Sequence, residues 1–256
     1  MRPPMREDWR PAVAIVQARM TSSRLPGKVM KPLAGAPLIR RMIERMLRIE
    51  GIDRVVIALA EGQAHDPVIG ALQGLDVAVV RGSEEDVLSR YAAAARDSGA
   101  ATVMRVTSDC PLLDPKVSAT VLAAFICARS SGTRYVRTSA QSGYPHGFDT
   151  EVFDVAALYE AEAKATERFD REHVTPYLWR QPAIFPAVIL DARPDRRNWR
   201  LTVDTPEDYR IASAIYDALY PGNPHFGYAE IIALFAAHPD LRSAAETAFA
   251  AHAAAR

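Results

Sequence analysis

The sequence predicts an α/β domain built on a mainly parallel sheet flanked by helices. Short apolar runs alternate with amphipathic helical stretches through the first half of the chain, which is typical of a parallel sheet covered on both faces. A length of 256 residues, of which 49% are hydrophobic, suits one such domain with a small appended lobe. We expect residues 12–220 to form this domain, residues 1–11 a loose lead-in and residues 221–256 a C-terminal helical extension.

Apolar periodicity predicts alternating strands and helices in the first half. The helix over Pro37–Ile49 follows from an apolar stripe along one face. Ser83, with Asp86 three residues later, predicts the start of the helix Glu84–Asp97 through a variant of the capping box. The other helices are expected at Asp66–Leu72 and Pro115–Arg129, and the strands at Val13–Gln17, Arg54–Leu59, Val77–Val80 and Thr102–Thr107.

The second half is less regular. Residues 135–151 are rich in Gly, Tyr, Pro and His, which predicts a loop with short strands. Thr205 is expected to cap a helix that begins at Pro206 and ends near Tyr220. Further helices are expected at Val155–Ala165 and Glu172–Arg180, strands at Ile184–Leu190 and Trp199–Val203, and two closing helices after residue 224, the last being the Ala-rich Leu241–Arg256.

The charge balance excludes functions that need a strongly basic protein. The chain has 31 Lys and Arg residues against 31 Asp and Glu, so no bulk field attracts nucleic acid or an anionic membrane. The first residues are polar, without the apolar core of a signal peptide, and no apolar run approaches the length of a membrane span. Cys110 and Cys127 lack metal-ligand spacing and a disulfide framework, so we expect buried small hydrophobes in a reducing cytoplasm.

The loop after the first strand carries an unusual cluster of positive charge. The apolar run Val13–Val16 leads into a segment that holds Arg19, Arg24, Lys28 and Lys31. These cations repel one another unless a polyanion lies among them, and a triphosphate suits both the bidentate grip of Arg and the point charge of Lys. The loop matches neither the Walker A pattern nor a Gly-x-Gly-x-x-Gly fingerprint. The alternative is a solvated basic loop with turn residues.

Two aspartates follow predicted strands on the same side of the sheet. Asp109 comes just after the strand Thr102–Thr107, at the edge where open α/β sheets bind ligands. Asp204 directly precedes the helix that Thr205 caps, which leaves its carboxylate free. Two carboxylates opposite a cationic loop indicate a magnesium site, because Mg²⁺ takes few protein carboxylates and completes its shell with water and phosphate oxygens. The alternatives are that Asp109 turns the chain before Pro111 and that Asp204 assists the cap.

Three further segments could contact ligands. Gly82 and Ser83 lie where a strand meets a helix, and backbone N–H groups at such a turn can read a base or a ribose. Residues 144–151 and 171–177 concentrate polar and aromatic side chains on presumed loops, and His146, Asp149 and His173 belong to these segments. Their polarity fits an acceptor pocket, although a single His in a fold is usually structural.

Several of these segments together resemble the cytidylyltransferase family of sugar-acid enzymes. The segment Gln-Ala-Arg-Met-Thr-Ser-Ser-Arg-Leu-Pro-Gly-Lys at 17–28 is similar to the signature loop of that family. The branch of this family that takes part in spore-coat polysaccharide biosynthesis is also similar, in the segments Arg-Gly-Ser-x-x-Asp-Val-Leu, Thr-Ser-Asp-Cys-Pro-Leu, Tyr-Pro-x-Gly-x-Asp-x-Glu-Val-Phe, Arg-Glu-His-Val-Thr-Pro-Tyr and Thr-Val-Asp-Thr-Pro-Glu-Asp. The matches extend from about residue 12 to about residue 220.

The resemblance implies a Rossmann-like nucleotide-diphospho-sugar transferase fold, a small dimerisation or acceptor lobe, a homodimer, CTP as donor, Mg²⁺ as cofactor and a small acidic acceptor. It implies that Asp109 and Asp204 hold the metal and, with Arg19 and Lys28, form the catalytic set. The nucleotide-binding residues would be Gln17, Ala18, Arg19, Ser23, Arg24, Gly27, Lys28, Arg81, Gly82, Ser83, Arg105 and Ser108, and the acceptor-binding residues Tyr144, His146, Asp149, Glu151, His173 and Thr175.

The expected reaction is transfer of CMP from CTP to the acceptor with release of pyrophosphate. The Tyr-Pro-His-Gly-Phe-Asp loop differs from its counterparts in the sialic-acid and octulosonate enzymes. The acceptor is therefore open between nonulosonic acids, phosphonates and other small acids. Two alternatives remain at this point: a glycosyltransferase of polysaccharide biosynthesis that uses a nucleotide-sugar donor, and a non-catalytic nucleotide-binding partner.

Overall fold

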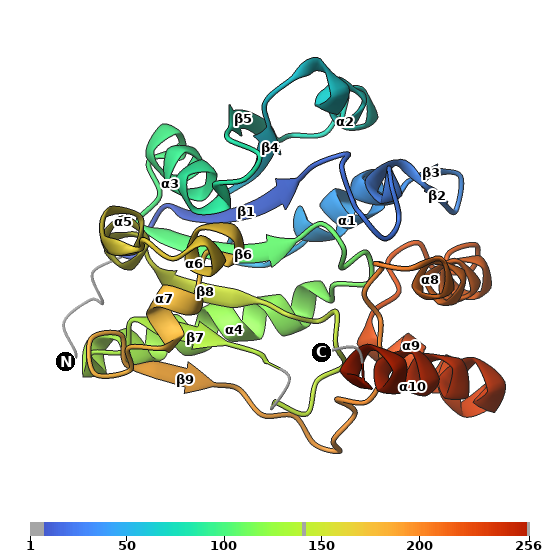
Figure 1. Cartoon of the computed structure of the whole chain (residues 1–256). Coiled ribbons are helices and arrows are strands. Elements are labelled where there is room, and N and C mark those ends of the chain that lie inside the picture. The colour runs from blue at the N-terminus through green and yellow to red at the C-terminus, as the bar shows by residue number, and fades with distance from the viewer. Residues whose placement is uncertain (1–7, 140–141, 255–256) are drawn as a thin grey trace.

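The protein folds around one seven-stranded sheet (Figure 1). The computed structural model describes residues 8–139 and 142–254, so most of the expected lead-in and the last two residues of the chain lie outside the described part. The strand order is β5-β4-β1-β6-β8-β7-β9. The strands are β1 Ala12–Ala18, β4 Arg54–Ala60, β5 Ala78–Gly82, β6 Thr102–Thr107, β7 Tyr135–Arg137, β8 Glu151–Asp154 and β9 Ala187–Ile189, with a separate hairpin of β2 Pro32–Leu33 and β3 Ala36–Pro37.

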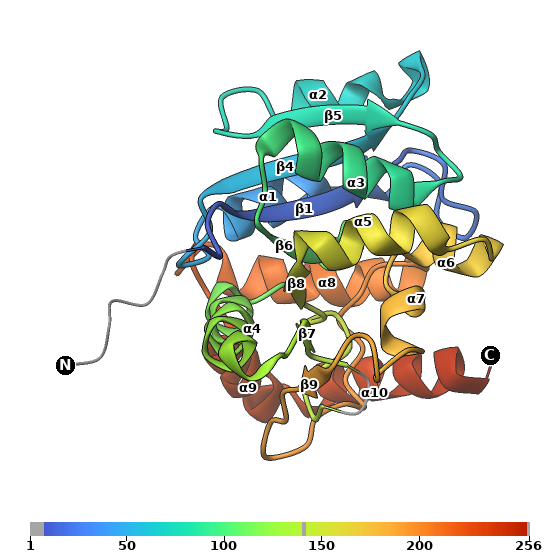
Figure 2. The same ribbon diagram turned by 90° about the vertical axis from the view of Figure 1, so that its left-hand side faces the viewer.

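Helices cover both faces of the sheet, as the alternating pattern predicts (Figure 2). Val13 and Ile15 of β1 pack with α3 and α5, whereas Ala14 and Val16 face the cluster that contains α1, α2 and α4. A third apolar cluster joins α8, α9 and α10 at one end of the sheet. The helices are α1 Leu38–Met46, α2 Asp66–Ala71, α3 Val87–Ser98, α4 Pro115–Ala128, α5 Val155–Lys164, α6 Arg168–His173, α7 Pro176–Trp179, α8 Pro206–Leu219, α9 Tyr228–Ala237 and α10 Pro239–Ala254.

The mainly parallel α/β class is confirmed. Strands β5, β4, β1 and β6 run parallel to one another. Strand β8 enters antiparallel to both β6 and β7, and β9 then pairs parallel with β7. The regular half of the sequence therefore forms the parallel part of the sheet, and the irregular half supplies its mixed end.

The predicted cap of the helix Glu84–Asp97 is wrong. Helix α3 begins at Val87, and its N-cap is Asp86, whose carboxylate accepts a hydrogen bond from the Ser89 amide at 3.0 Å. Ser83 instead accepts from the Asp86 amide at 3.1 Å. Ser83 thus stabilises the turn before the helix, and the sequence pattern placed the cap three residues too early because both side chains are good caps.

Other expected elements are interrupted. The helix predicted over Glu172–Arg180 is divided into α6 and α7, because Val174 between them has a φ of +71°, outside the helical region. The segment Trp199–Val203 is extended but is no strand of the sheet, since only an isolated bridge links Arg200 to His146. Cys110 is buried as expected, whereas Cys127 is exposed on α4.

None of the helices in the described part of the chain combines the length and apolarity that a bilayer span requires. The expected cytoplasmic location and the division of the chain at residues 12 and 220 stay predictions.

Candidate active site

The carboxyl ends of β1 and β6 position the site. These two strands are parallel neighbours, and Gln17 near the end of β1 lies beside Thr107 at the end of β6. The segments that follow them, the basic loop and the turn of Asp109, therefore leave the sheet at the same edge. A cavity of about 350 Å³ opens there, at the place where α/β sheets bind ligands.

Most of the predicted nucleotide and metal residues line this cavity. They come from the basic loop, β6 and its following turn, α6 and the segment before α8. The predicted residues in the lining are Gln17, Ala18, Arg19, Ser23, Arg24, Lys28, Arg105, Ser108, Asp109, His173 and Asp204. Residues that the sequence did not single out also line it: Ser22, Val87, Arg90, Thr107 and Glu172.

Backbone contacts bring Asp204 beside Asp109. The Val203 amide donates a hydrogen bond to the Asp109 carbonyl at 2.7 Å. The Lys28 ammonium donates to the Val203 carbonyl at 2.9 Å. The basic loop and the two acidic segments, separated by up to 176 residues in sequence, are thereby joined at one point.

The Asp204 carboxylate was expected to be free, and this is wrong. It accepts hydrogen bonds from Lys28 Nζ at 2.8 Å and from Arg200 Nη2 at 2.7 Å, and Arg24 Nη2 lies 3.2 Å away. Thr205 does cap α8, in a capping box with Asp208, as expected. The expectation failed because it did not include the cations Lys28, Arg24 and Arg200, which contact the Asp204 carboxylate. Burial acts to raise the pKa of Asp204, but Lys28, Arg24 and Arg200 outweigh it and lower the pKa to about 2.

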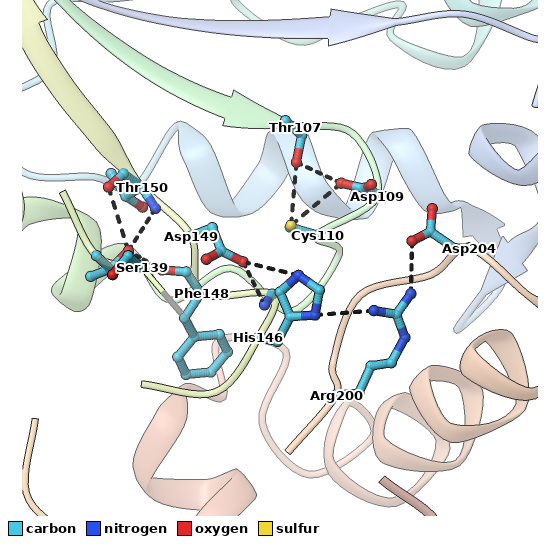
Figure 3. Close-up of polar contacts among 12 residues, drawn as sticks. Thr107, Asp109, Cys110, Ser139, His146, Phe148, Asp149, Thr150, Arg200 and Asp204 are labelled. Atoms are coloured by element: carbon cyan, nitrogen blue, oxygen red, sulfur yellow. Dashed lines mark hydrogen bonds and ion pairs between the residues drawn. The ribbon is translucent and has the colours of Figure 1, made fainter. Parts of the chain in front are cut away.

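Arg200 is the central support of Asp204. Its side chain is 1% exposed, and its guanidinium donates to Asp208 Oδ1 at 2.9 Å as well as to Asp204. Figure 3 shows the guanidinium between the His146 ring and Asp204, with His146 Nδ1 3.0 Å from Arg200 Nη1. This buried guanidinium has carboxylates on two sides, which satisfies the rule that a buried charge must be paired.

Asp109 is held more loosely. Its Oδ1 accepts a hydrogen bond from Thr107 Oγ1 at 2.5 Å, and its Oδ2 lies 3.7 Å from Lys28 Nζ. The side chain remains 28% exposed, against 14% for Asp204. The Lys28 ammonium therefore lies between the two carboxylates, and each of them keeps at least one oxygen directed toward the same cation.

This donor set fits a magnesium ion. Two carboxylates already share a cation position, and Mg²⁺ usually takes one or two protein carboxylates together with water and phosphate oxygens. Within the described residues no cluster of three or more Asp, Glu, His or Cys could enclose a metal without such outside ligands.

The turn at 81–83 lies outside the cavity lining. Arg81 pairs with Asp66 and donates to the Gly62 carbonyl at 3.0 Å. Gly82 packs tightly on Arg90, because a Cβ at this position would lie 2.8 Å from Arg90 Cγ. Arg90 donates to the carbonyls of Ser83 and Glu84 and also lines the cavity. The sequence does not indicate that Arg90 is a site residue, because its contacts with the turn before α3 form only when the chain folds.

Two predicted acceptor residues lie behind Arg105 instead of at the cavity surface. Glu151 is 8% exposed, and its carboxylate accepts hydrogen bonds from Tyr135 and from Thr175 Oγ1, the latter at 3.0 Å. The same carboxylate pairs with the Arg105 guanidinium. Burial acts to lower the pKa of Arg105, but Glu151 outweighs it and raises the pKa. Thr175 therefore fixes the Glu151 carboxylate, and Glu151 in turn holds Arg105, which lines the cavity.

The remaining predicted residues also lie away from the lining. The Tyr144 ring packs on Tyr228, with centroids 6.2 Å apart. Asp149 accepts from the Gly147 amide at 2.9 Å and faces His146, and burial raises the pKa of this carboxyl. Gly27 has a φ of +66° and donates to the Met20 carbonyl at 3.0 Å, which closes the basic loop just before Lys28. The roles assigned to these residues stay predictions.

Comparisons with known proteins agree on one family. Residues 13–234 match the sequence profile of the cytidylyltransferase family. The spore coat polysaccharide biosynthesis protein SpsF of Bacillus subtilis is 32% identical over 234 residues, which cover 88% of this chain and 94% of that protein. A 3-deoxy-manno-octulosonate cytidylyltransferase of Mesorhizobium japonicum is 30% identical over 202 residues, 73% of this chain and 82% of that enzyme. The solved structure of a cytidylyltransferase from Leptospira borgpetersenii superposes with a TM-score of 0.85 at 27% identity, covering 91% of this chain and 96% of that one.

Proposed function

This chain belongs to the cytidylyltransferase family, and from that premise we propose that it transfers CMP from CTP to a small acidic acceptor and releases pyrophosphate. The observation that carries the proposal is the convergence of the basic loop, Asp109 and Asp204 on one cavity at the sheet edge. Such a site offers cations for a triphosphate and carboxylates for its metal. A glycosyltransferase that uses a nucleotide sugar has no comparable need for the basic loop.

The cations of the cavity contact the protein's own carboxylates. Lys28 contacts Asp204 at 2.8 Å, Arg24 contacts it at 3.2 Å, and Arg19 lies 4.0 Å from Glu84. A triphosphate entering the cavity brings its own negative charge, so these three cations can exchange a carboxylate for phosphate oxygens. The carboxylates released by the exchange are then available to the metal.

Asp109 and Asp204 would hold Mg²⁺. The ion would supply positive charge against the phosphate oxygens. The chain's own contribution is position: Arg200 fixes the Asp204 carboxylate, and Thr107 orients that of Asp109. Preorganised charges of this kind need no rearrangement as charge develops during the reaction.

The acceptor oxygen would attack the α-phosphorus in line with the departing pyrophosphate. The enzyme's task is to align the reactants and to neutralise charge on the leaving group, for which Arg19, Arg24 and Lys28 are placed. A hydroxyl acceptor must lose its proton during this attack. A phosphonate or carboxylate acceptor is already ionised at neutral pH and needs no base.

The sequence assigns Arg105 to the nucleotide, and the contacts of its guanidinium support a proposal that it instead meets the acidic acceptor. Its guanidinium lines the cavity, and one buried donor, Nε, has no hydrogen-bond partner among the described residues. Glu151 and the 3.5 Å contact of Nη2 with Gln17 Oε1 fix the rest of the group. A carboxylate or phosphonate of a sugar acid or similar molecule would complete its bonding, because an unmade buried hydrogen bond is costly.

A pyrophosphate-release screen tests the proposal. CTP, UTP, ATP and GTP are each combined with Mg²⁺ and with panels of nonulosonic acids, other sugar acids and phosphonates, with Asp109→Asn as the background protein. We expect release from CTP with one class of acidic acceptor. Nucleoside diphosphate release from a nucleotide sugar would instead identify a glycosyltransferase, and CTP binding without pyrophosphate release from any pair would identify a non-catalytic partner.

The homodimer implied by the family resemblance is part of the proposal. The edge strand β9 exposes Val188 and Ile189, and Trp179 and Ile184 nearby in the chain are also exposed. An uncovered apolar strand edge is a common site of association. Light scattering on the full chain checks this: a monomer at micromolar concentration would contradict it.

A further inference from the structure

A second cavity lies apart from the active site. Its volume is about 370 Å³, and it shares no lining residue with the cavity at the sheet edge. One wall is helix α1; the other is α8 with the segment that follows it. The lining residues are Arg41, Glu44, Arg45, Leu47, Arg48, Tyr216, Tyr220, Pro224 and His225.

Two arginines of this cavity, Arg45 and Arg48, have no carboxylate partner among the described residues, and the Arg45 guanidinium instead stacks on the Phe226 ring at 4.6 Å and lies beside the Tyr216 hydroxyl. Arg45 is 2% exposed; its Nε donates to the Leu113 carbonyl at 2.6 Å, but its buried Nη2 has no hydrogen-bond partner among the described residues. Arg48 donates from Nε to the Glu44 carbonyl at 3.2 Å. In the described part of the chain, neither Arg45 nor Arg48 forms a salt bridge. Buried guanidinium groups are normally paired, so this is an uncommon arrangement.

The single carboxylate in the lining does not neutralise these charges. Glu44 Oε1 lies 3.1 Å from Arg40 Nε, and its Oε2 lies 2.8 Å from Arg41 Nη1. One negative charge is thus shared between two other arginines. The pKa of Arg48 is lowered by burial and by the charge of Arg45, which agrees with a local excess of positive charge.

We propose that this cavity binds a phosphate-type oxyanion, either free phosphate or the phosphate of a small metabolite. Guanidinium groups recognise phosphate through parallel hydrogen bonds, and the unpartnered Nη2 of Arg45 is a donor in place for one of them. The Arg48 guanidinium is the second donor. The site is distinct from that of the CTP triphosphate, since the two cavities have no residue in common.

The same side chains support the turn behind Asp109. Arg45 holds the Leu113 carbonyl, and the Tyr216 hydroxyl donates to the Pro111 carbonyl at 2.7 Å. Both acceptors belong to the turn of residues 110–113, which directly follows Asp109. An oxyanion bound by Arg45 therefore lies one contact away from the turn that carries an active-site carboxylate.

Calorimetric titration separates this site from the active site. All proteins carry Arg24→Gln, which weakens phosphate binding at the basic loop. Arg48→Gln is then added to test the second cavity, and Arg40→Gln is the control, because Arg40 lies on α1, eight residues before Arg48, and does not line the cavity. The probes are inorganic phosphate and, separately, ribose 5-phosphate.

We expect Arg24→Gln protein to bind at least one probe and added Arg48→Gln to weaken that binding at least about fivefold. Added Arg40→Gln should change it less than about twofold. Tighter binding of ribose 5-phosphate identifies an organic phosphate, and equal binding identifies free phosphate. The proposal is overturned if Arg24→Gln protein binds neither probe, or if Arg48→Gln leaves the affinity unchanged. Circular dichroism checks folding, and Arg48→Lys, which keeps the charge, replaces the glutamine variant if that one is unfolded.

Discussion

The two carboxylates of the active-site cavity lie side by side but are balanced in different ways. Asp204 is 14% exposed and contacts three cations: Lys28, Arg24 and Arg200. Asp109 is 28% exposed and has one cation, Lys28, at the longer distance of 3.7 Å. The folded chain therefore fixes Asp204 and neutralises its charge, whereas Asp109 is held mainly by the hydroxyl group of Thr107.

This difference predicts that the two acids, both proposed to hold the metal, contribute unequally to the stability of the fold. Asp204 belongs to a buried network that the fold needs, so its loss should affect the whole molecule. Asp109 lies at a more exposed turn, so its charge can be removed with less effect on folding. Lys28 contributes to both environments, because its ammonium lies between the Asp109 and Asp204 carboxylates.

The largest effect is expected where the Asp204 network is broken at its centre. Arg200→Met removes the buried partner of Asp204 and Asp208 and should lower the free energy of unfolding by about 3–5 kcal/mol. The exposed Arg210 on α8 is the control, since Arg210→Met should cost less than about 1 kcal/mol. Urea denaturation of both variants measures the difference. Equal stability of the two would show that Arg200 does not support the site.

Asp109→Asn should lower the activity strongly while leaving the stability of the fold almost unchanged. In the proposed reaction its charge helps to hold the metal, so pyrophosphate release should fall by about a hundredfold or more. Its side chain is only partly buried, so the free energy of unfolding should change by less than about 1 kcal/mol. Asp97→Asn, on the exposed side of α3, should alter neither quantity. A variant with near-normal turnover would remove Asp109 from the catalytic set.

Asp204 should make the stability depend on acid pH. Its pKa in the folded protein is about 2, below the value near 3.9 in an unfolded chain, so its contribution is complete above about pH 5 and is lost as the pH falls through 2. Asp204→Asn should cost about 2 kcal/mol at pH 7. Urea denaturation at pH 7 and pH 3 should show the difference between variant and wild type shrinking at the lower pH. A constant difference would mean that Asp204 is not held in its charged form.

Arg24→Gln should have the smallest effect on stability. The Arg24 side chain is about half exposed, and exposed ion pairs contribute less than about 1 kcal/mol. Its effect should appear instead as a higher KM for CTP that falls away at high salt, because screening weakens the interaction with the triphosphate. Steady-state kinetics at two ionic strengths measure this. A lowered kcat with unchanged KM would place Arg24 at the reaction step instead of in binding.

Local sequence patterns were sufficient to predict the parallel half of the sheet. The expected strands coincide with β1, β4 and β6 to within a residue or so, because fully buried strands give continuous apolar runs between turn residues. The basic loop and both aspartates could be found in the same way, since the loop and Asp109 follow apolar strands and Asp204 precedes a capped helix. These features depend only on neighbours in the chain.

Contacts between distant segments explain what was missed. Trp199–Val203 has the alternation of a strand, but its backbone hydrogen bonds go to the loop residues Asp109, His146 and Arg196 and to Ala245 of α10, and not to a strand of the sheet. No sequence pattern marks Arg90 or Arg200 as a site residue. Their contacts, Arg90 with the Ser83 carbonyl and Arg200 with His146, form only in the folded chain. The expectation of a free carboxylate at Asp204 failed because cations contact it that the sequence analysis did not pair with it, among them Lys28, which is 176 residues away in sequence, and Arg200, four residues earlier in a non-helical segment.

A crystal structure of the complex with CTP and Mg²⁺ tests the central claim, which is an exchange of partners by Lys28. We expect the Lys28 ammonium to contact a phosphate oxygen and both carboxylates to face the metal. A triphosphate bound elsewhere, with Lys28 still hydrogen-bonded to Asp204, would contradict it.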